Sequence, residues 1–125
     1  MKVAKINEDE QLVFAWANIA KTAAGELVVD SHDEVIYPED LELAAYEYVL
    51  QFSDMGVDHI GEAQGHLVES LMLTKEKAAA MGISGPVPEG WWVGYHIPDP
   101  DLFAKVKSGE YPMMSIQGVA EAQEI

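Results

Sequence analysis

The most constraining feature of the chain is one long amphipathic segment that begins at Pro38. Apolar side chains recur there with the spacing of a single helix face, at Leu41, Ala44, Ala45, Tyr48, Val49 and Phe52. Proline suits the first turn of a helix, and the acids Glu39 and Asp40 favour its positive end. Met55-Gly56 is expected to end this helix. The fold must therefore bury one face of it against the rest of the chain.

Strand patterns dominate the remainder of the sequence. Strands rich in β-branched and aromatic residues are expected at 11–20, at 27–29 after a turn, around His59, and at 66–74, 91–97 and 111–118. Short helices are expected at 75–81, closed by Gly82, and from Pro98 to about Lys107. Helices thus separate non-adjacent strands. This order predicts a single α+β domain, residues 1–125, built on an antiparallel sheet or barrel.

Side chains alternate between the two sides of a strand, and this predicts which residues share a face. On 66–74, Glu69 falls on a face with Leu67, Leu71 and Leu73, so it lies either at a strand end or in a buried site with a purpose. Trp91 and Trp92 are adjacent and must point to opposite sides. One is expected in the core; the other would line a substrate groove, form a dimer contact or face solvent.

Composition excludes several functions. The net charge is −15, with 22 acids against 7 basic residues, all lysine, which argues against nucleic-acid binding and favours basic partners or simply a solvated surface. No apolar run approaches the roughly 18 residues of a membrane span, and no signal peptide is visible. The absence of cysteine excludes disulfides, thiol catalysis and zinc–thiolate sites. A cytoplasmic protein without a membrane partner is the simplest interpretation.

One serine, Ser115, stands inside the apolar segment 111–118. Its hydroxyl is either a packing accident or a nucleophile on a rigid element, and it needs a base to take its proton at neutral pH. The decisive question is whether a histidine reaches it. His32 stands among acids. A minor alternative is therefore a metal-binding domain that uses His32, His59 and His66 with nearby acids. No metal and no cofactor are expected.

Four stretches, in order along the chain, resemble a known family. They are Val29-Asp30-Ser31 with Pro38-Glu39, Gly65 with Val68-Glu69-Ser70, Gly90-Trp91-Trp92-Val93-Gly94, and Met114-Ser115-Ile116-Gln117-Gly118. Together they resemble the XkdF-like phage serine proteases, relatives of the prohead proteases that mature capsids and distant relatives of the herpesvirus assemblins. The likeness spans about residues 12 to 120. It implies a herpesvirus-protease-like fold, with an antiparallel β-barrel-like core flanked by helices.

The resemblance also implies the site. Ser115 maps onto the catalytic nucleophile and His59 onto its general base, with His66 as the alternative base. Backbone N–H groups at Gly118 would hold the oxyanion, because the arginine used by assemblin-type sites has no counterpart in this arginine-free chain.

The third catalytic member stays open, because its family position falls beyond Ile125. Glu69 and Glu121 are candidates for that role, and a dyad is another possibility.

By resemblance, the protein is expected to be a serine endopeptidase that cleaves scaffold and major capsid proteins. It would act inside the assembling phage procapsid, in the host cytoplasm. A homodimer is expected by analogy with assemblins. The alternative is a non-catalytic, protease-like module that binds capsid or portal components during head assembly. Gln117 in place of a glycine and the absence of arginine favour that alternative.

Overall fold

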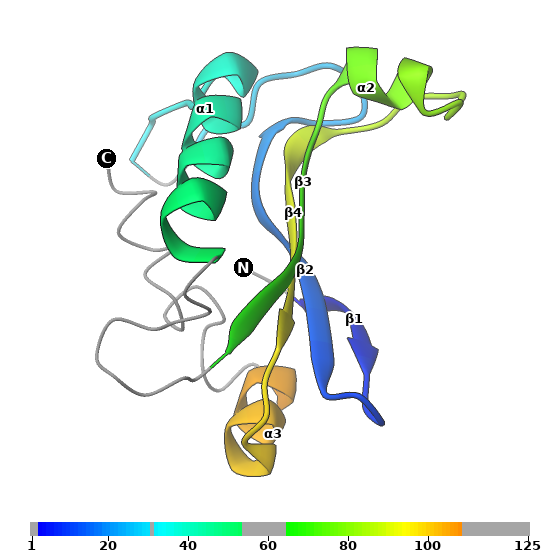
Figure 1. The fold of residues 1–125 in the computed structure, drawn as a ribbon. Helices are drawn as coiled ribbons and strands as arrows, with labels where there is room; N and C mark the ends of the chain where they lie inside the picture. The colour runs from blue at the N-terminus through cyan, green and yellow to red at the C-terminus, as the bar shows by residue number, and fades with distance from the viewer. Residues whose placement is uncertain (1–2, 31, 54–64, 109–125) are drawn as a thin grey trace.

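A computed structural model describes residues 3–30, 32–53 and 65–108 of the 125-residue chain. It contains an antiparallel sheet in the order β1-β2-β4-β3, with helices packed beside it (Figure 1). The strands are β1 (Val3–Asn7), β2 (Leu12–Lys21), β3 (His66–Leu73) and β4 (Glu89–His96). The helices are α1 (Pro38–Tyr48), α2 (Lys75–Ala80) and α3 (Pro100–Ser108), and a π-helical turn, Val49–Ser53, continues α1.

The α+β class and the antiparallel sheet are therefore confirmed. Within the described residues the sheet is open, with β1 and β3 as its two edges, so the closed barrel-like core is not shown. In the same ranges, every helix is too short or too polar to cross a bilayer.

The partner of β2 in the amino-terminal hairpin is β1, which the sequence patterns did not reveal. The connecting turn has no glycine; instead Gln11 adopts the left-handed region, with φ of 56°. Its side-chain amide donates to the carbonyl oxygens of Ile97 and Pro98, at 2.6 and 2.9 Å. The prediction of a strand at 27–29 was wrong. Only a single bridge between Lys21 and Leu27 forms there, because the apolar side chains of this stretch are largely exposed and bury nothing.

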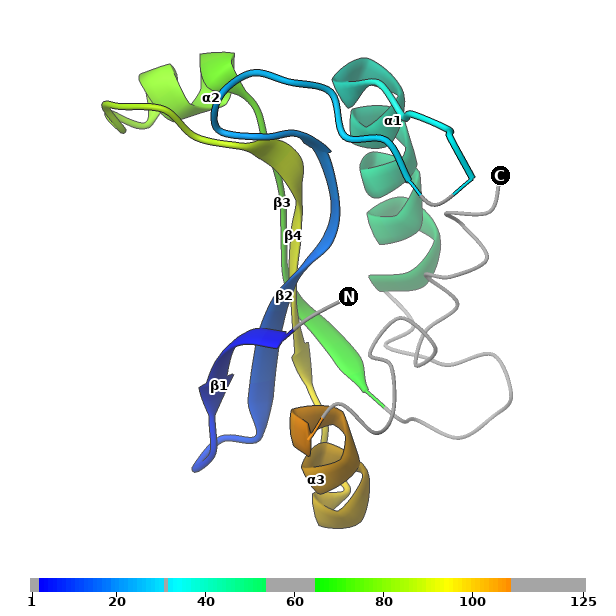
Figure 2. The ribbon, with the colours of Figure 1, turned by 180° about the vertical axis from the view of Figure 1, so that it is seen from behind.

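One face of the sheet, called the inner face here, is covered by α1 (Figures 1 and 2). The predicted helical stripe is confirmed, because Leu41, Ala45 and Tyr48 are buried against the strands. Trp91 is the core tryptophan of the pair, with 0 % exposure, and the Tyr48 ring meets it edge-on at 5.4 Å. Further inner-face residues with no exposure include Val13, Ala15, Val93 and Tyr95. Burial of large apolar side chains, at about 1.5–3 kcal/mol each, makes this face the main source of stability.

The opposite face, called the outer face, carries Lys5, Phe14, Trp16, Glu69, Leu71 and Trp92. The helices that contact the sheet lie on the other side, and no described helix covers this face (Figure 2). Trp92 stacks on Phe14 with ring centres 6.2 Å apart and meets Trp16 edge-on at 5.3 Å. The second tryptophan is therefore half-buried among other rings.

A bulge in β3 changes which of its side chains share a face. The register shifts between Leu67 and Glu69, so Leu67 lies with Ser70 and Met72 on the inner face. Glu69 lies with Leu71 on the outer face. The prediction that Leu67 shares a face with Glu69 was wrong, because the inserted residue, Val68, inverts the alternation.

Local capping explains the two short helices, whose existence the sequence predicted. The Thr74 hydroxyl accepts the backbone N–H of Lys77 at 3.2 Å, and the buried Glu89 carboxylate accepts that of Lys75 at 3.1 Å, so both cap α2. Gly82, with φ of 81°, follows the helix in the left-handed region. At α3, the Asp99 carboxylate accepts the N–H of Asp101 at 2.9 Å.

Candidate active-site cleft

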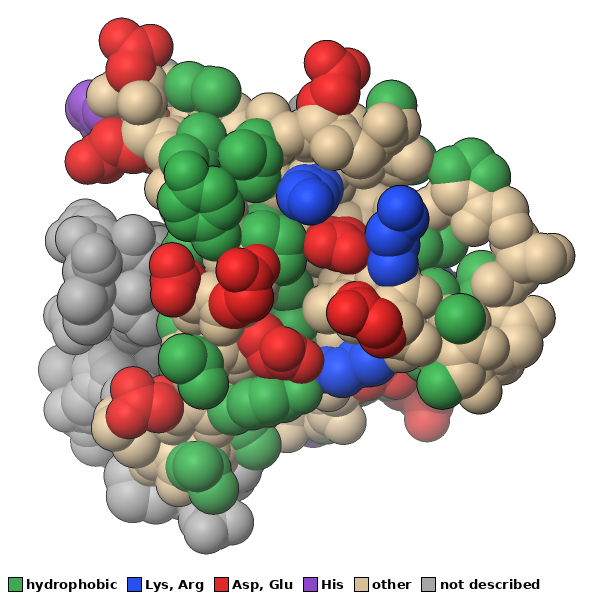
Figure 3. Space-filling model, turned by 90° about the horizontal axis from the view of Figure 1, so that it is seen from above, with side chains coloured by type: hydrophobic (Ala, Val, Ile, Leu, Met, Phe, Trp, Pro, Cys, Tyr) green, Lys and Arg blue, Asp and Glu red, His purple; other side chains and the backbone are tan. Residues whose placement is uncertain are grey.

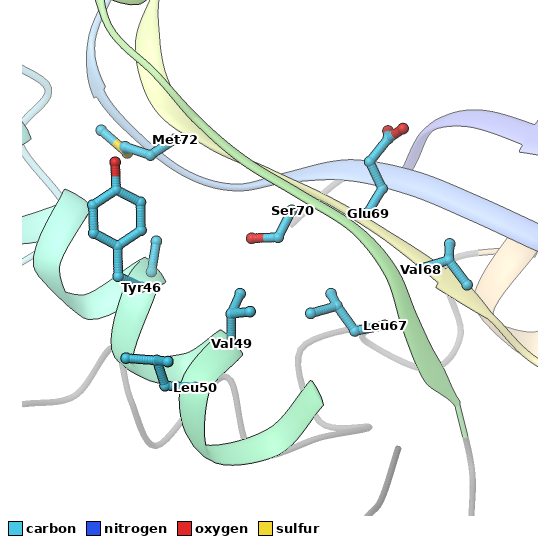
Figure 4. Close-up of a pocket in the computed structure, with 9 residues that line it drawn as sticks. Tyr46, Val49, Leu50, Leu67, Val68, Glu69, Ser70 and Met72 are labelled. Carbon is cyan, nitrogen blue, oxygen red and sulfur yellow. The ribbon is translucent and has the colours of Figure 1, made fainter. Parts of the chain in front are cut away.

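A cleft of about 650 Å³ opens between α1 and β3 on the inner face (Figure 4). This volume lies in the range of sites that bind small ligands or peptide side chains. Most of the lining is apolar. It consists of Ala45, Tyr46, Val49 and Leu50 on the helical side and of Leu67, Val68, Glu69, Ser70 and Met72 on the strand side. An apolar groove beside an edge strand is suited to a peptide rather than to a charged metabolite.

The cleft opens where the buried stripe of α1 gives way to the π-helical turn. Tyr48 is still buried, but Leu50 is 77 % exposed at the rim. π-Helical turns recur at functional sites because they re-aim side chains by one position. An exposed leucine on the edge of an apolar cleft extends the surface that a ligand can bury.

Ser70 supplies the hydroxyl that points into the cleft (Figure 4). Its Oγ accepts the Trp91 Nε1–H at 2.9 Å, so its own proton remains available to donate to a bound group. In the described part of the chain no histidine bonds to Ser70, so none of the described histidines serves it as the base that a nucleophile requires. Sequence reasoning did not assign this role to Ser70.

The hydroxyls of Tyr48 and Tyr95 form a buried pair beside the cleft, 2.9 Å apart. Burial raises the pKa of Tyr48 to about 12, and it raises the pKa of Tyr95 further, with the neighbouring Tyr48 adding to the effect. Both groups therefore stay neutral at physiological pH. The hydrogen bond between them links α1 to β4.

A polar clamp joins α1 to α2 near the other end of the cleft. Lys77 forms an ion pair with Glu42 at 2.8 Å and donates to the Tyr46 hydroxyl at 2.6 Å. Hydrogen bonding from Lys77 holds the pKa of the Glu42 carboxyl below its usual range. Acidic side chains, with a few lysines among them, surround apolar patches on the surface seen from above (Figure 3). The exposed carboxylates of α1, at Glu39, Asp40 and Glu47, would favour a basic segment nearby.

The described candidate residues lie at the start of β3. His66 is half-buried, and its ring stacks on that of His96, its cross-strand neighbour, with centres 6.4 Å apart. Glu69 borders the cleft, but its carboxylate points away from α1 (Figure 4) and accepts the Trp92 Nε1–H at 2.9 Å. In this region of the structure, Glu69 is directed to the outer face and His66 pairs with a second histidine.

The remaining candidates lie outside the described residues: His59, Ser115, Gly118 and Glu121. Their roles stay predictions.

The loop that carries His32 forms a compact turn. The Asp30 carboxylate accepts the backbone N–H groups of His32 and Glu34, at 2.8 and 2.9 Å, and these bonds lower its pKa. Among the residues that the structure describes, no group of three or more acids and histidines could hold a metal ion. The acid at the centre of this loop therefore organises the backbone.

The model of one protein family, described as Putative phage serine protease XkdF, matches residues 2–124. The chain belongs to this family. Membership in the XkdF family confirms the resemblance carried by the four motifs, and the match covers nearly the whole sequence. The family name supports a phage serine protease in general terms. No curated protein and no solved structure matches the chain.

Proposed function

We propose that this XkdF-family protein is a serine endopeptidase that cleaves scaffold and major capsid proteins during phage head maturation. The match of the family model to residues 2–124 carries this proposal. The protein would act inside the assembling procapsid, in the host cytoplasm. The apolar cleft beside β3 supports the proposal independently, because a peptidase needs a groove that accepts side chains of a polypeptide.

The proposed chemistry is acyl transfer through a covalent intermediate. The Ser115 Oγ attacks the carbonyl carbon of the scissile bond while His59 takes the hydroxyl proton. Backbone N–H groups at Gly118 stabilise the negative oxygen that forms. His59 then gives its proton to the leaving amine. In the second step His59 takes a proton from the water that attacks the acyl carbon, and returns it to the Ser115 Oγ as the ester bond breaks. His66 is the alternative base, and Glu69 and Glu121 remain candidates for the residue that orients it.

Chain connectivity supports a location for this chemistry at the cleft. The chain leaves the helical wall at Ser53 and enters the strand wall at His66, so His59 is six residues from one and seven from the other. At about 3.3–3.6 Å per residue, neither tether lets His59 lie much more than about 25 Å from these ends. The segment that carries the proposed base therefore connects the two walls of the groove.

The segment that carries Ser115 begins at the end of α3. Ser115 follows the last residue of α3, Ser108, by seven positions. The start of β3 pairs with the end of β4, through His66 and His96, and β4 leads into α3. The predicted strand 111–118 would have the open edge of β3 available for pairing, which would extend the sheet toward the barrel-like core of the proposal.

The surroundings of the cleft suggest which segments are cut. Apolar walls select an apolar side chain, and the Ser70 hydroxyl can donate to a peptide carbonyl. The exposed acids of α1 and a net charge of −15 favour substrates with lysine or arginine close to the cleavage site.

Cleavage of a peptide library derived from a bacterial proteome tests the function. The full chain should generate new termini with an apolar residue and a basic neighbour, and Ser115→Ala and His59→Ala should each lower the rate about 10³-fold or more. Ser84→Ala is the matched control, since it removes an exposed hydroxyl outside the cleft lining and should retain the activity. Cleavage that persists in Ser115→Ala would refute the proposed nucleophile. A folded protein that cuts nothing would favour the non-catalytic assembly module, which the absence of arginine already suggests.

A further inference from the structure

The outer face of the sheet carries one row of residues with opposite charges at its two ends. Cross-strand pairing aligns Lys5 with Phe14, Phe14 with Gly94, and Gly94 with Glu69. The Lys5 ammonium lies 5.5 Å from the centre of the Phe14 ring, and Glu69 accepts the indole N–H of Trp92. The row therefore runs across all four strands from a cation on one edge strand to an anion on the other.

Glycines leave room for aromatic rings at the centre of this face. A Cβ atom on Gly94 would come within 2.7 Å of the Phe14 ring, and one on Gly90 within 3.3 Å of the Trp16 ring. The Phe14 and Trp16 rings thus pack directly over the backbone of β4 at its two glycines. Together with Trp92 and Leu71 they form a low apolar platform. Such a platform suits packing against a second sheet better than insertion of a single side chain.

We propose that the outer face is the contact surface of a homodimer. A two-fold axis parallel to the strands, between β2 and β4, would place β1 of one copy over β3 of the other. Because Lys5 and Glu69 share one row, this operation sets Lys5 opposite the partner's Glu69, and does so twice. A two-fold axis across the strands would instead oppose Lys5 to Lys5. The charges therefore select one of the two face-to-face arrangements.

The size of the face sets the expected affinity. Four strands at about 4.8 Å spacing give a platform roughly 19 Å wide. Pairing two such faces buries an area near the lower end of specific interfaces, roughly 1,200 Å² in total. We therefore expect a reversible dimer that depends on concentration. This arrangement does not require Ser115 to be catalytic. It places the Glu69 carboxylate in the interface, which leaves Glu121 as the candidate for the residue that orients the base.

Sedimentation equilibrium of the full chain, from about 1 μM to about 1 mM, tests the proposal, a range that brackets a small interface. Wild type should show a monomer–dimer equilibrium. Lys5→Glu and Glu69→Lys should each raise the Kd by about tenfold or more, since each opposes like charges twice. The double variant K5E/E69K should restore the wild-type Kd to within about threefold, because the pairs are re-formed with their signs exchanged.

Two controls separate this specific pairing from general charge effects. Lys105→Glu, at an exposed position of α3, makes the same charge change as Lys5→Glu and should leave the Kd unchanged within about twofold. Glu69→Lys reduces the net negative charge, so weaker association in that variant cannot come from overall repulsion. A monomer at every concentration would overturn the proposal. So would a dimer that neither reversal weakens, or one that the charge exchange fails to restore.

Discussion

Trp91 and Trp92 are neighbours in β4, yet they belong to two different surfaces. Each indole N–H donates at 2.9 Å to one of two neighbours in β3, Trp91 to Ser70 and Trp92 to Glu69. Trp91 is fully buried beneath α1, whereas Trp92 is half-buried on a face that no described helix covers. The two tryptophans thus make hydrogen bonds of the same length but contribute differently to stability. The inner face stabilises the fold, and the outer face is available for association.

Truncation of each tryptophan gives the largest expected contrast between the two faces. Trp91→Ala should lower the free energy of unfolding by about 3–5 kcal/mol, because it empties a large volume in the core. Trp92→Ala should cost about 1 kcal/mol, since its ring loses only partial burial. Urea unfolding at low protein concentration measures both. Equal losses would show that the outer face is part of the core after all.

High pH should weaken the inner face selectively. The pKa of Tyr48 is raised to about 12 and that of Tyr95 is also raised, whereas unfolded tyrosines titrate near pH 10. Above about pH 10 the unfolded chain loses protons that the folded chain keeps, so the free energy of unfolding falls as pH rises. We expect a loss of about 1–3 kcal/mol between roughly pH 9 and pH 11.

Urea unfolding across this pH range measures the loss, and a double variant supplies the internal reference. Tyr48→Phe/Tyr95→Phe should show a much flatter pH dependence, while Tyr37→Phe, at an exposed position, should keep the wild-type slope. An unchanged slope in the double variant would contradict the assignment of the effect to this buried pair.

On the outer face, Gly94→Ala should cost about 1–2 kcal/mol, because the new methyl group displaces the Phe14 ring that lies 2.7 Å from its position. In a Phe14→Ala background the same substitution should cost little. A double-mutant cycle from urea unfolding gives the coupling between the two positions. Full additivity would mean that the ring does not lie over the glycine.

The smallest expected contrast concerns the two acceptors in β3. Ser70→Ala leaves the buried Trp91 N–H without its partner and should cost about 1 kcal/mol. Glu69→Ala should change the stability of the monomer by no more than about 0.5 kcal/mol, because water can replace the carboxylate at an exposed position. A larger loss for Glu69→Ala than for Ser70→Ala would reverse the assignment of the two faces.

The two faces also differ in how well the sequence predicted them. The α1 stripe follows from periodicity, so its core residues were predictable. The strand at 91–97 follows from its residue types, which did not tell which of Trp91 and Trp92 is buried. Strand β1 was missed because its turn uses a left-handed Gln11 instead of glycine. The β3 bulge was missed because an inserted residue leaves no pattern in one sequence. The pairing of Tyr48 with Tyr95, 47 residues apart, depends on tertiary packing alone.

The site was predicted less completely than the fold. Family motifs, confirmed by the family match, pointed to Ser115 and His59, and both lie outside the described residues. The cleft is formed by α1, the π-helical turn and β3. Local sequence patterns do not predict where a helix and a strand separate to leave such a cleft.

The most direct measurement is the site of modification by a fluorophosphonate, which reacts with activated serine hydroxyls. Peptide mass spectrometry of the labelled, folded protein should place the adduct on Ser115, and His59→Ala should abolish it while Ser70→Ala does not. No adduct on a protein that unfolds cooperatively, or an adduct on Ser70 instead, would contradict the proposed peptidase site.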